Sequence, residues 1–414
     1  MLAWFSDLNA RERRTMTACF GGWSLDALDV QIFSFVIPSL LALWKITAGQ
    51  AGELATVTLL VSSFGGWIAG ALSDRFGRVR VLQITILWYA VFTFLCGFAQ
   101  NFEQLFLFRA LQGLGFGGEW AAGAVLMGEV IRDKYRGRAV GIVQTGWSIG
   151  WGAAALLYTI LIAVLPEALA WRALFWIGIA PAGLVFWIRR FVEEPELNRR
   201  RAAPAGIWHI FSALKPPYLA TTWRVALMVT GAQGGSYALT IWLPTYLKTV
   251  RHISSVGTGS YLLVLILGAF FGFVSGAYLA DAIGRKATFI FSAVGSVVLT
   301  IVYLFAPISN EWILLVGFLL GYISLAMFSP MGSFMTELYP TAVRGVGQGF
   351  CYNAGRGIGA LFPAAVGFLA AQFGLGLAIA VFSIAAYGLM IVALMLLPET
   401  HGRSLESLES PGAV

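Results

Sequence analysis

The chain has few charged residues for its length. Only 11% of its 414 residues are Asp, Glu, Lys or Arg, while 58% are hydrophobic and the mean hydropathy is +0.79. Soluble domains carry roughly 25% charged residues, so a water-soluble globular protein is excluded. The 31 Phe and 15 Trp exclude a fibrous or disordered chain. The composition therefore indicates an integral membrane protein.

Residue patterns that hold metals, disulfides or nucleotides are also scarce. The three cysteines, Cys19, Cys96 and Cys351, lie in or beside apolar runs and form no Cys-x-x-Cys pair, so we expect no disulfide framework and no metal site. There is no Walker motif, and the glycine-rich GLGFGG follows no strand pattern, which excludes a nucleotide-binding fold. No catalytic triad is recognisable. We therefore expect no cofactor and no enzymatic activity.

Apolar runs long enough to cross a membrane are abundant. A spanning helix needs ~20 apolar residues. The N-terminal MLAWFSDLNARERR has acidic residues and no small-residue cleavage site, so the first run is expected to remain as a span. The sequence predicts an all-α protein with about twelve transmembrane helices, six in each half. The runs begin near Thr17, Glu53, Val81, Gln104, Ala139, Trp171, Thr222, Gly257, Ala287, Glu311, Val346 and Leu375.

One polar stretch divides these runs into two sets. Residues 193–217, EEPELNRRRAAPAGIWHIFSALKPP, gather charge, proline and arginine between the sixth and seventh runs. We predict an N-terminal six-helix half over residues 1–192, a cytoplasmic linker over 193–220, and a C-terminal six-helix half with a short cytoplasmic tail over 221–414.

Basic residues are concentrated on one side of the predicted membrane. Of the 27 Lys and Arg, 21 fall in the N-terminus, the loops after the second, fourth, eighth and tenth helices, the linker with its flanks, and the tail, whereas four fall in the opposite loops. The positive-inside rule therefore predicts that both termini are cytoplasmic, in a multi-pass protein of the cell inner membrane. This distribution accounts for the net charge of +7, so no nucleic-acid partner is expected. We expect a monomer in the lipid bilayer.

A charged turn occurs twice, half a chain apart. GALSDRFGR at residues 70–78 nearly recurs as YLADAIGRK at 278–286, an offset of 207 positions between the two aspartates (281 − 74). A second motif, GEVIRDKYRGR, is matched in the same way by TELYPTAVRG. The chain is therefore predicted to contain two halves of the same orientation, as parallel repeats do. The matching residues are Asp74 with Asp281, Glu129 with Glu337, and Arg136 with Arg344.

These motifs resemble those of the major facilitator superfamily. GALSDRFGR looks like its signature loop, AYLADAIGRK like the weaker copy, and RALQGLGFGG at 109–118 like the fourth-helix signature of its proton-coupled members. LDALDVQIFSFVIP, GGEW and PETHGRSLE are similar to the organic-acid:proton symporters, with the sialate and aromatic-acid groups closest. The resemblance covers essentially the whole chain and implies two six-helix halves around a central cavity. The second loop departs from the pattern, because Ala282 stands where the first copy has Arg75.

The signature loops are expected to form a cytoplasmic gate. Asp74 can accept hydrogen bonds from helix N-termini, Gly77 permits a tight turn, and Arg75 and Arg78 can pair with carboxylates such as Glu129. Contacts that hold only when the cytoplasmic side is shut would stabilise the outward-open state. The alternative is a set of charges that only fix topology. The predicted gating residues are Asp74, Arg75, Gly77, Arg78, Glu129, Arg136, Asp281, Arg285, Glu337 and Arg344.

Charges near the membrane midplane are the candidates for proton coupling, because each costs at least ~2.5 kcal/mol there. Asp26 and Asp29 share a face of the first helix, and Arg109 and Glu119 share a face of the fourth. In the family, an aspartate of the first helix and the arginine at this position are commonly coupled. We expect ionised Asp29 to pair with Arg109, and protonated Asp29 to free Arg109 for a substrate carboxylate. Asp26 and Glu119 are further proton-coupling candidates. The alternative for Asp26 or Asp29 is a polar residue at a helix end, and the alternative for Glu119 is a partner for a signature-loop arginine.

Arg356 is the sharpest candidate for substrate binding. It lies near the middle of the eleventh helix and needs an anion there. That anion is either a fixed partner such as Glu119 or a substrate carboxylate, which the planar guanidinium binds bidentately. The half-chain offset matches Arg356 with Ser148, so the duplicated scaffold does not require the charge. The predicted substrate-binding residues are Arg109, Arg356, Asn353, Gln144, Trp147, Gln233 and Tyr237, each of the neutral ones having inter-helix packing as its alternative.

The sequence thus predicts a secondary active transporter that imports an organic anion by proton symport through alternating access. A sugar or polyol carrier of the same fold is the first alternative, and it would leave Arg356 without an anion. A non-transporting sensor is the second, and it would be expected to carry a longer cytoplasmic loop or tail. GAQGGSYALTIWLPTYL lacks the His and Asp expected of lactate-type members, so sialate, aromatic acids and other carboxylates stay open.

Overall fold

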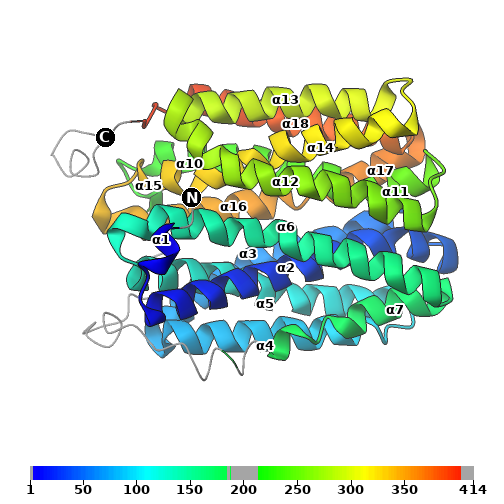
Figure 1. Ribbon diagram of the computed structural model, residues 1–414, viewed down its shortest axis with the longest axis horizontal. Helices are drawn as coiled ribbons and strands as arrows, with labels where there is room; N and C mark the ends of the chain where they lie inside the picture. Colours follow the sequence, from blue (N-terminus) through cyan, green and yellow to red (C-terminus); the bar gives the residue numbers. More distant parts are fainter. Residues whose placement is uncertain (1–2, 184–186, 188–212, 402–414) are drawn as a thin grey trace.

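The molecule is a bundle of long helices that run side by side. The computed structural model describes residues 3–183, 187 and 213–401, and all regular structure within these residues is helical (Figure 1). The all-α fold class predicted from the sequence is confirmed.

The helices form two sets, one before and one after the predicted linker. The N-terminal set comprises α1 (Ala3–Ser6), α2 (Ala10–Leu43), α3 (Ala48–Phe76), α4 (Arg78–Cys96), α5 (Phe102–Val130), α6 (Asp133–Val164) and α7 (Glu167–Ile177). The C-terminal set comprises α10 (Leu219–Thr240), α11 (Leu243–Thr249), α12 (Ser255–Ile283), α13 (Arg285–Phe305), α14 (Asn310–Ala326), α15 (Phe328–Thr336), α16 (Thr341–Gly359), α17 (Phe362–Phe373) and α18 (Leu375–Met395).

The observed helices begin close to the predicted apolar runs. The largest difference is seven residues, between the predicted start near Thr17 and the observed start of α2 at Ala10. The early start has a local cause. The side chain of Asn9 accepts a hydrogen bond from the Glu12 N–H at 2.8 Å, and the Glu12 carboxylate accepts one from the Asn9 N–H at 2.9 Å. This capping box makes polar residues ahead of the apolar run helical.

Three predicted spans of the C-terminal half are each broken into two helices. The breaks separate α10 from α11, α14 from α15, and α16 from α17. Pro244, Pro330 and Pro363 lie in the first turn of the segment that follows each break. Proline has no N–H to donate to the preceding turn and is tolerated at a helix start, so each proline is compatible with the helix that begins there.

Nine helical segments of the described chain are long and apolar enough to cross a membrane. Helices α5, α7 and α10 begin beside the other three predicted runs but do not meet the same criterion. The count of twelve spans therefore stays a prediction.

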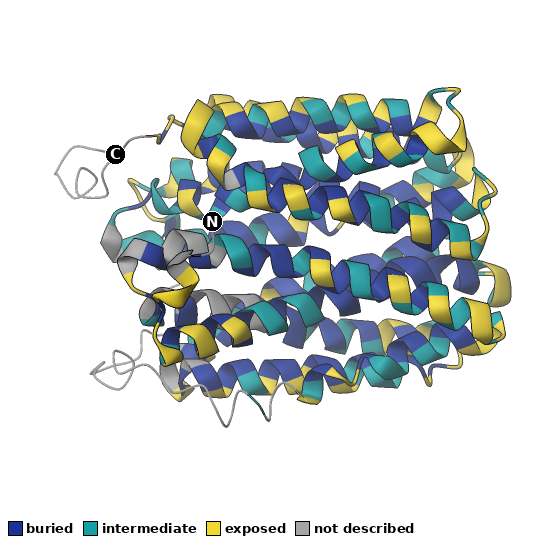
Figure 2. Cartoon of the chain, viewed as in Figure 1, coloured by how far each residue is buried: buried dark blue, intermediate teal, exposed yellow. Residues whose placement is uncertain are grey.

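Exposed residues lie on the outside of the bundle, while buried residues face its interior (Figure 2). Many of the exposed residues are large and apolar. Val164 is 69% exposed, Met395 68% and Trp312 61%. A surface this apolar would drive association in water, but it is compatible with lipid tails, which are equally apolar. The chain is a multi-pass membrane protein.

The two signature loops adopt the same backbone turn. Gly77, between α3 and α4, has φ 101°, and Gly284, between α12 and α13, has φ 99°. Side chains disfavour this conformation, so both turns require glycine. The offset between the two glycines is 207 residues (284 − 77), the same as between the two loop aspartates.

The second signature loop is held by contacts inside the C-terminal half. Arg285 forms an ion pair with Asp281 and lies 3.3 Å from Glu337 at the end of α15. Glu337 also accepts a hydrogen bond from Thr400 Oγ1 at 2.5 Å. Arg344 donates to the carbonyl of Tyr339, also in the C-terminal half, at 3.2 Å. None of these contacts crosses to the N-terminal half, so the predicted role of these residues in gating is not tested by them.

The tail residue Glu399 caps α13. Its carboxylate accepts hydrogen bonds from the backbone N–H groups of Arg285 at 3.2 Å and Lys286 at 3.0 Å. It also accepts from the N–H groups of Thr400 at 2.8 Å and His401 at 3.0 Å. Burial acts to raise the pKa of Glu399, but these backbone hydrogen bonds lower the pKa more, so it lies below its usual value. The carboxylate is therefore expected to stay ionised and to stabilise the start of α13.

Several predicted site residues have side chains outside the described part of the molecule. They are Asp74, Arg75, Arg78, Glu119, Glu129 and Arg136. Most of the predicted linker also lies outside the described residues, so the proposed domain boundaries stay predictions.

Replacing Glu399 with Gln is expected to lower the free energy of unfolding at neutral pH by less than about 1 kcal/mol, because an exposed charge at a helix N-terminus contributes ~0.3–1 kcal/mol. The folded-state pKa is depressed, so this contribution is present above the unfolded value of about 4.3 and is lost as the pH falls through the folded value. Thermal unfolding of both proteins in detergent at about pH 7 and about pH 3 checks this. A stability difference that does not shrink at the lower pH would contradict it.

Candidate functional site

The two halves meet along several helix pairs. Helix α6 packs on α12 and contacts α15, α3 packs on both α16 and α17, and α2 contacts α11. The residues between these pairs come from both halves, so a site located there changes shape whenever one half moves relative to the other.

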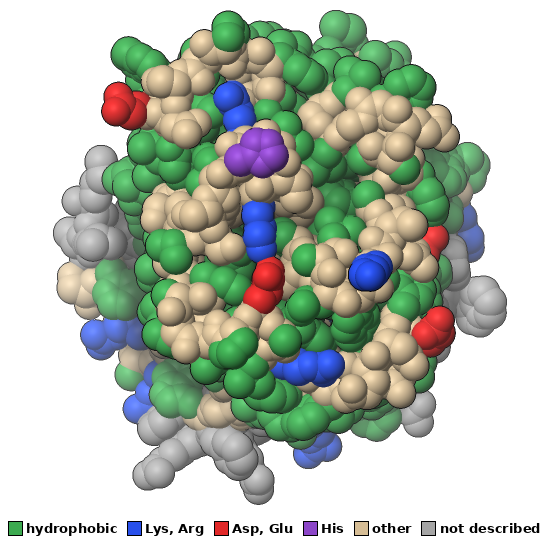
Figure 3. Space-filling view, turned by 90° about the vertical axis from the view of Figure 1, so that its right-hand side faces the viewer, with side chains coloured by type: hydrophobic (Ala, Val, Ile, Leu, Met, Phe, Trp, Pro, Cys, Tyr) green, Lys and Arg blue, Asp and Glu red, His purple; other side chains and the backbone are tan. Residues whose placement is uncertain are grey.

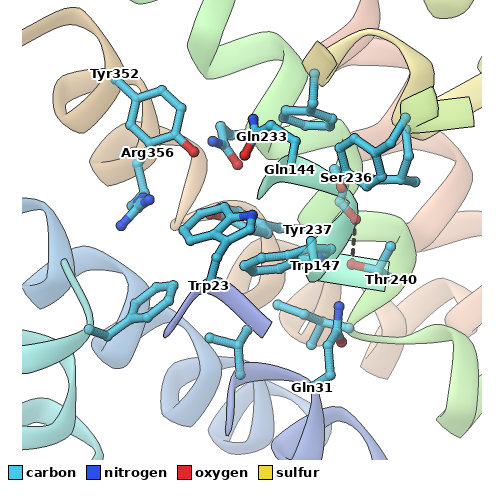
Figure 4. A pocket seen from close by; sticks show the side chains of 16 residues that line it. Trp23, Gln31, Gln144, Trp147, Gln233, Ser236, Tyr237, Thr240, Tyr352 and Arg356 are labelled. Carbon is cyan, nitrogen blue, oxygen red and sulfur yellow. Dashed lines mark hydrogen bonds between the residues drawn. The ribbon is translucent and has the colours of Figure 1, made fainter. Parts of the chain in front are cut away.

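A cavity lies at this junction (Figure 4). Helices α2, α5 and α6 line it from one half, and α10, α12, α14, α15 and α16 from the other. Its largely aromatic walls suit a small organic ligand. The polar lining residues are Gln31, Gln144, Gln233, Ser236, Thr240 and Arg356, and the aromatic ones are Trp23, Phe116, Trp147, Tyr237, Phe273, Phe328 and Tyr352.

Five of the seven predicted substrate-binding residues line this cavity; they are Gln144, Trp147, Gln233, Tyr237 and Arg356. Arg109 and Asn353 are not among the described lining residues. The Asn353 amide instead donates to the Gly349 carbonyl at 3.0 Å. It also packs so closely on α3 that a Cβ added to Gly66 would lie 2.4 Å from Asn353 Oδ1. Asn353 is placed between α16 and α3 rather than at the cavity wall.

Arg356 enters the cavity as a buried cation with unused donors. It is 1% exposed, and its Nε and Nη1 have no hydrogen-bond partner among the described residues. The guanidinium carbon lies 5.0 Å from the ring centroids of both Phe116 and Tyr352, within cation–π range. Asp26 of α2 contributes to its electrostatic surroundings across the junction. The side chain of Glu119, considered above as a fixed partner of Arg356, lies outside the described part of the molecule.

Arg356 lies to one side of the cavity in Figure 4, and Gln31 and Thr240 lie to the other, with the Trp23 and Trp147 rings between them. The two indole centroids are 5.1 Å apart and the planes are tilted by 46°. On the wall, Gln144 Oε1 is buried without a hydrogen-bond partner among the described residues. The cavity thus offers a cationic end, flat aromatic walls and neutral polar groups.

Sequence reasoning did not single out several lining residues, namely Trp23, Gln31, Ser236, Thr240, Phe273, Phe328 and Tyr352. Helical spacing could have found part of this set. Ser236 and Thr240 extend the stripe of Gln233 and Tyr237 along α10, at intervals of three or four residues. Tyr352 precedes Arg356 by one turn of α16. Phe273 and Phe328 carry no such signal, because phenylalanines are frequent throughout the chain.

Asp29 and Arg109 are both buried in the N-terminal half, each 2% exposed, but no ion pair joins them. Thr93 Oγ1 donates to Asp29 Oδ2 at 2.8 Å, Gln112 Nε2 donates to Thr93 Oγ1 at 2.7 Å, and Arg109 Nη1 donates to Gln112 Oε1 at 3.0 Å. The Arg109 guanidinium also covers the Phe33 ring at 4.1 Å. Two side chains therefore intervene where the sequence suggested a direct pair.

The other groups of interest in this half are Asp26 and the cysteines. Asp26 is fully buried one turn before Asp29 on α2. All three cysteines are buried, and no disulfide joins them. Among the described residues, no group of three or more His, Cys, Asp and Glu could hold a metal ion.

The end of the bundle opposite the signature loops is closed by contacts between the halves. Lys248 Nζ on α11 lies 2.7 Å from Glu167 Oε1 on α7, and the same oxygen accepts a hydrogen bond from Ser39 Oγ on α2 at 2.9 Å. Figure 3 shows this end, where uncharged atoms cover most of the surface and charged side chains are few. The ion pair thus spans the two halves in a setting with little competing charge.

Glycines allow close backbone contact at the same end. A Cβ added to Gly52 of α3 would lie 2.5 Å from the Pro363 carbonyl oxygen. One added to Gly367 of α17 would lie 2.3 Å from the carbonyl oxygen of Ala48. Any side chain at these glycine positions would separate the two helices. These four residues form what we call the glycine seam.

A cavity enclosed between two halves of membrane-embedded helices, with its few polar groups directed inward, defines a membrane transport protein. Two overlapping segments, residues 19–362 and 267–413, match the family model of the Major Facilitator Superfamily. The chain belongs to this superfamily, and it is a transport protein rather than an enzyme, as the sequence predicted.

Two relatives and one solved structure place the chain further. It is 41% identical over 409 residues to the probable 4-methylmuconolactone transporter of Cupriavidus pinatubonensis, covering 99% of this chain and 95% of the relative. It is 32% identical over 376 residues to the cis,cis-muconate transport protein of Acinetobacter baylyi, covering 88% of each. The inward-open xylose transporter XylE from E. coli superposes with a TM-score of 0.72 at 18% identity, covering 95% of this chain and 98% of that one. This last likeness shows a common fold.

Replacing Glu167 with Gln is expected to shift the conformational population toward states open at this end by no more than about fivefold, since a half-exposed ion pair contributes ~0.2–1 kcal/mol. Distance distributions between spin labels on the exposed Val164 and Val250 measure the shift. Exchanging the two charges, with Glu167→Lys and Lys248→Glu together, should restore the original distribution. A double variant as open as the single one would show that the attraction between the two charges does not hold this end closed.

Proposed function

We propose that this protein imports an organic carboxylate across a bacterial inner membrane by proton symport, through alternating access. The observation that carries the proposal is Arg356, a buried cation at the cavity between the halves with two N–H groups that no described residue accepts. A buried cation whose N–H groups lack acceptors is costly. A carboxylate that enters the cavity can supply both the opposite charge and two acceptor oxygens.

The surroundings of Arg356 favour a flat, unsaturated acid. The Trp23 and Trp147 rings, together with Phe116 and Tyr352, offer aromatic faces beside the guanidinium. Such faces contact planar ligands over a large area. The two relatives described above are named for transport of 4-methylmuconolactone and cis,cis-muconate, which supports an unsaturated acid as the substrate class here.

The driving force is proposed to be the proton gradient. Asp29 is a carboxyl group buried in the N-terminal half and connected to Arg109 by hydrogen bonds. Taking up a proton there removes a buried negative charge, so the state of Asp29 alters the balance of charge around Arg109. Asp26 and Glu119 remain further candidates for the proton site.

Both termini are proposed to be cytoplasmic, with the signature loops forming the cytoplasmic gate. The excess of arginine and lysine at that end supports this orientation. Arg285 and Glu337 are the half-chain counterparts of Arg78 and Glu129, and their contact at 3.3 Å indicates how the first loop would be held.

Replacing Arg356 with Gln is expected to weaken binding of the preferred acid by about tenfold to a hundredfold for each hydrogen bond lost, while hardly changing binding of its neutral amide. Arg356→Lys should also fail, because an ammonium cannot reproduce the two parallel N–H donors. Thermal shift against a panel of unsaturated and aromatic acids selects the ligand, and calorimetry with that acid and its amide measures the loss.

Arg224→Gln is the matched control for Arg356, since Arg224 is exposed near the start of α10 and should not affect binding. Equal losses of acid and amide, or no loss of either, would make Arg356 a structural residue. Transport of a sugar or polyol would then be the better-supported function.

Uptake into proteoliposomes is expected to stop accumulating substrate when a protonophore collapses the proton gradient. Replacing Asp29 with Asn should abolish accumulation but leave exchange of substrate across the membrane partly intact, because exchange needs no net proton movement. Accumulation that persists with the protonophore would rule out proton symport. Equal loss of accumulation and exchange in the variant would indicate a structural role for Asp29.

A further inference from the structure

Three helices of the N-terminal half are joined by one continuous chain of hydrogen bonds. It runs from Arg109 and Gln112 on α5, through Thr93 on α4, to Asp29 on α2. All four side chains are at most 2% exposed. In so dry a setting a hydrogen bond is electrostatically stronger than in water, and neighbouring bonds polarise one another.

Every donor in this chain points toward Asp29. The arginine N–H donates to the Gln112 carbonyl, the Gln112 amide N–H donates to the Thr93 hydroxyl, and that hydroxyl donates to the carboxylate. This order suits an ionised Asp29, because each N–H or O–H directs the positive end of its dipole toward the negative group. The arginine can thus stabilise the carboxylate without touching it.

Thr93 has a second acceptor for its single proton. Its Oγ1 lies 2.8 Å from the backbone carbonyl oxygen of Tyr89, one turn earlier on α4, and also 2.8 Å from Asp29 Oδ2. The hydroxyl can donate to only one of them at a time. The Asp29 oxygen Oδ1 has no hydrogen-bond partner among the described residues, so Thr93 is the donor that the structure provides to this carboxylate.

Few other charged or titratable groups face Asp29. Arg109 faces it from α5 and Cys96 from α4, and both are in electrostatic range. Asp26 lies one turn earlier on its own helix. At the end of α7, Gly178 presents only its backbone, and a Cβ there would lie 3.1 Å from Asp29 Oδ1.

We propose that Thr93 and Gln112 are positioning residues that transmit the protonation state of Asp29 to Arg109. When Asp29 is ionised, Thr93 donates to it and the chain holds Arg109. When Asp29 takes up a proton, its new O–H donates to Thr93 Oγ1, and the Thr93 hydroxyl turns to the Tyr89 carbonyl. No proton passes along the chain. Arg109 then loses the polarised link to a negative charge and is held only by neutral groups.

This inference rests on the proposed function, in which Asp29 is the proton site. It differs from a direct aspartate–arginine pair in one testable respect. A direct pair would not need a hydroxyl at position 93, whereas the relay requires a group there that can both donate and accept. Valine has nearly the shape of threonine without the hydroxyl, and serine keeps the hydroxyl.

The first measurement needs no substrate. Infrared difference spectroscopy of the purified full-length protein follows the C=O band of the protonated carboxyl group as the pH changes, and the part of the band that is missing in Asp29→Asn belongs to Asp29. In Thr93→Val, which removes the donor to the ionised form, we expect the titration midpoint to rise by about one pH unit or more. Thr93→Ser should return it to the wild-type value.

The second measurement is transport, with radiolabelled cis,cis-muconate as the probe in proteoliposomes. Thr93→Val and Gln112→Leu should each reduce proton-driven accumulation about tenfold, in line with a shift of one pH unit, and reduce exchange by less than about twofold. Thr230→Val is the control, because Thr230 is equally buried and its only side-chain hydrogen bond among the described residues is to the carbonyl of Ala226 on its own helix. It should behave as wild type in both measurements.

The outcomes separate the two proposals. If Asp29→Asn removes part of the band and abolishes accumulation, but Thr93→Val leaves midpoint and accumulation unchanged, Asp29 is the proton site and the relay is wrong. The relay is also wrong if Thr93→Ser fails like Thr93→Val, or if Thr230→Val shifts the midpoint equally. If Asp29→Asn changes neither the band nor accumulation, both the relay and the assignment of Asp29 fall together.

Discussion

A charge buried inside a membrane protein is not solvated by water, so it must be paired with an opposite charge or a hydrogen-bonding group of the protein or of a ligand. The described buried charges meet this requirement in different ways. Arg109 is connected to Asp29 through two neutral side chains and is covered by Phe33. Arg356 has aromatic rings on its faces but no acceptor for two of its N–H groups. The first arrangement is self-contained within one half, whereas the second leaves two N–H groups without an acceptor among the described residues.

This division follows the two halves of the chain. The turn of the signature loop occurs in both halves, because the φ angles of Gly77 and Gly284 differ by only two degrees. The buried charges are not duplicated, because Arg356 is matched by Ser148 in the other half. One half can therefore carry a titratable site and the other an anion site while both keep the same scaffold. A movement of one half against the other would change the anion site, because both halves line it, and would leave the chain from Asp29 to Arg109 intact within one half.

The sequence predicted the positions of the helices well, because hydropathy and helix length depend only on residues near each other in the chain. The predicted start of α2 was seven residues too late. Capping by Asn9 extends the helix into polar residues, which a search for apolar runs does not include. The site was predicted in part. Arg356, Gln144 and Gln233 could be named because polar residues in apolar runs are conspicuous, but Thr93 could not. Threonines are common in these helices, and the role of Thr93 depends on how α4 is rotated against α2 and α5, which no local pattern records.

The glycine seam limits the size of the side chains that fit between α3 and α17 at the closed end. Gly52 faces a carbonyl oxygen of Pro363, and Gly367 faces one of Ala48, at distances that leave no space for a methyl group. A single alanine there would act as a spacer between the halves. Such a spacer offers a means of separating α3 from α17 at this end for structural study. The seam also tolerates few substitutions. The atom that faces each glycine belongs to the backbone, so a larger residue in place of a glycine cannot be offset by a smaller residue on the facing helix.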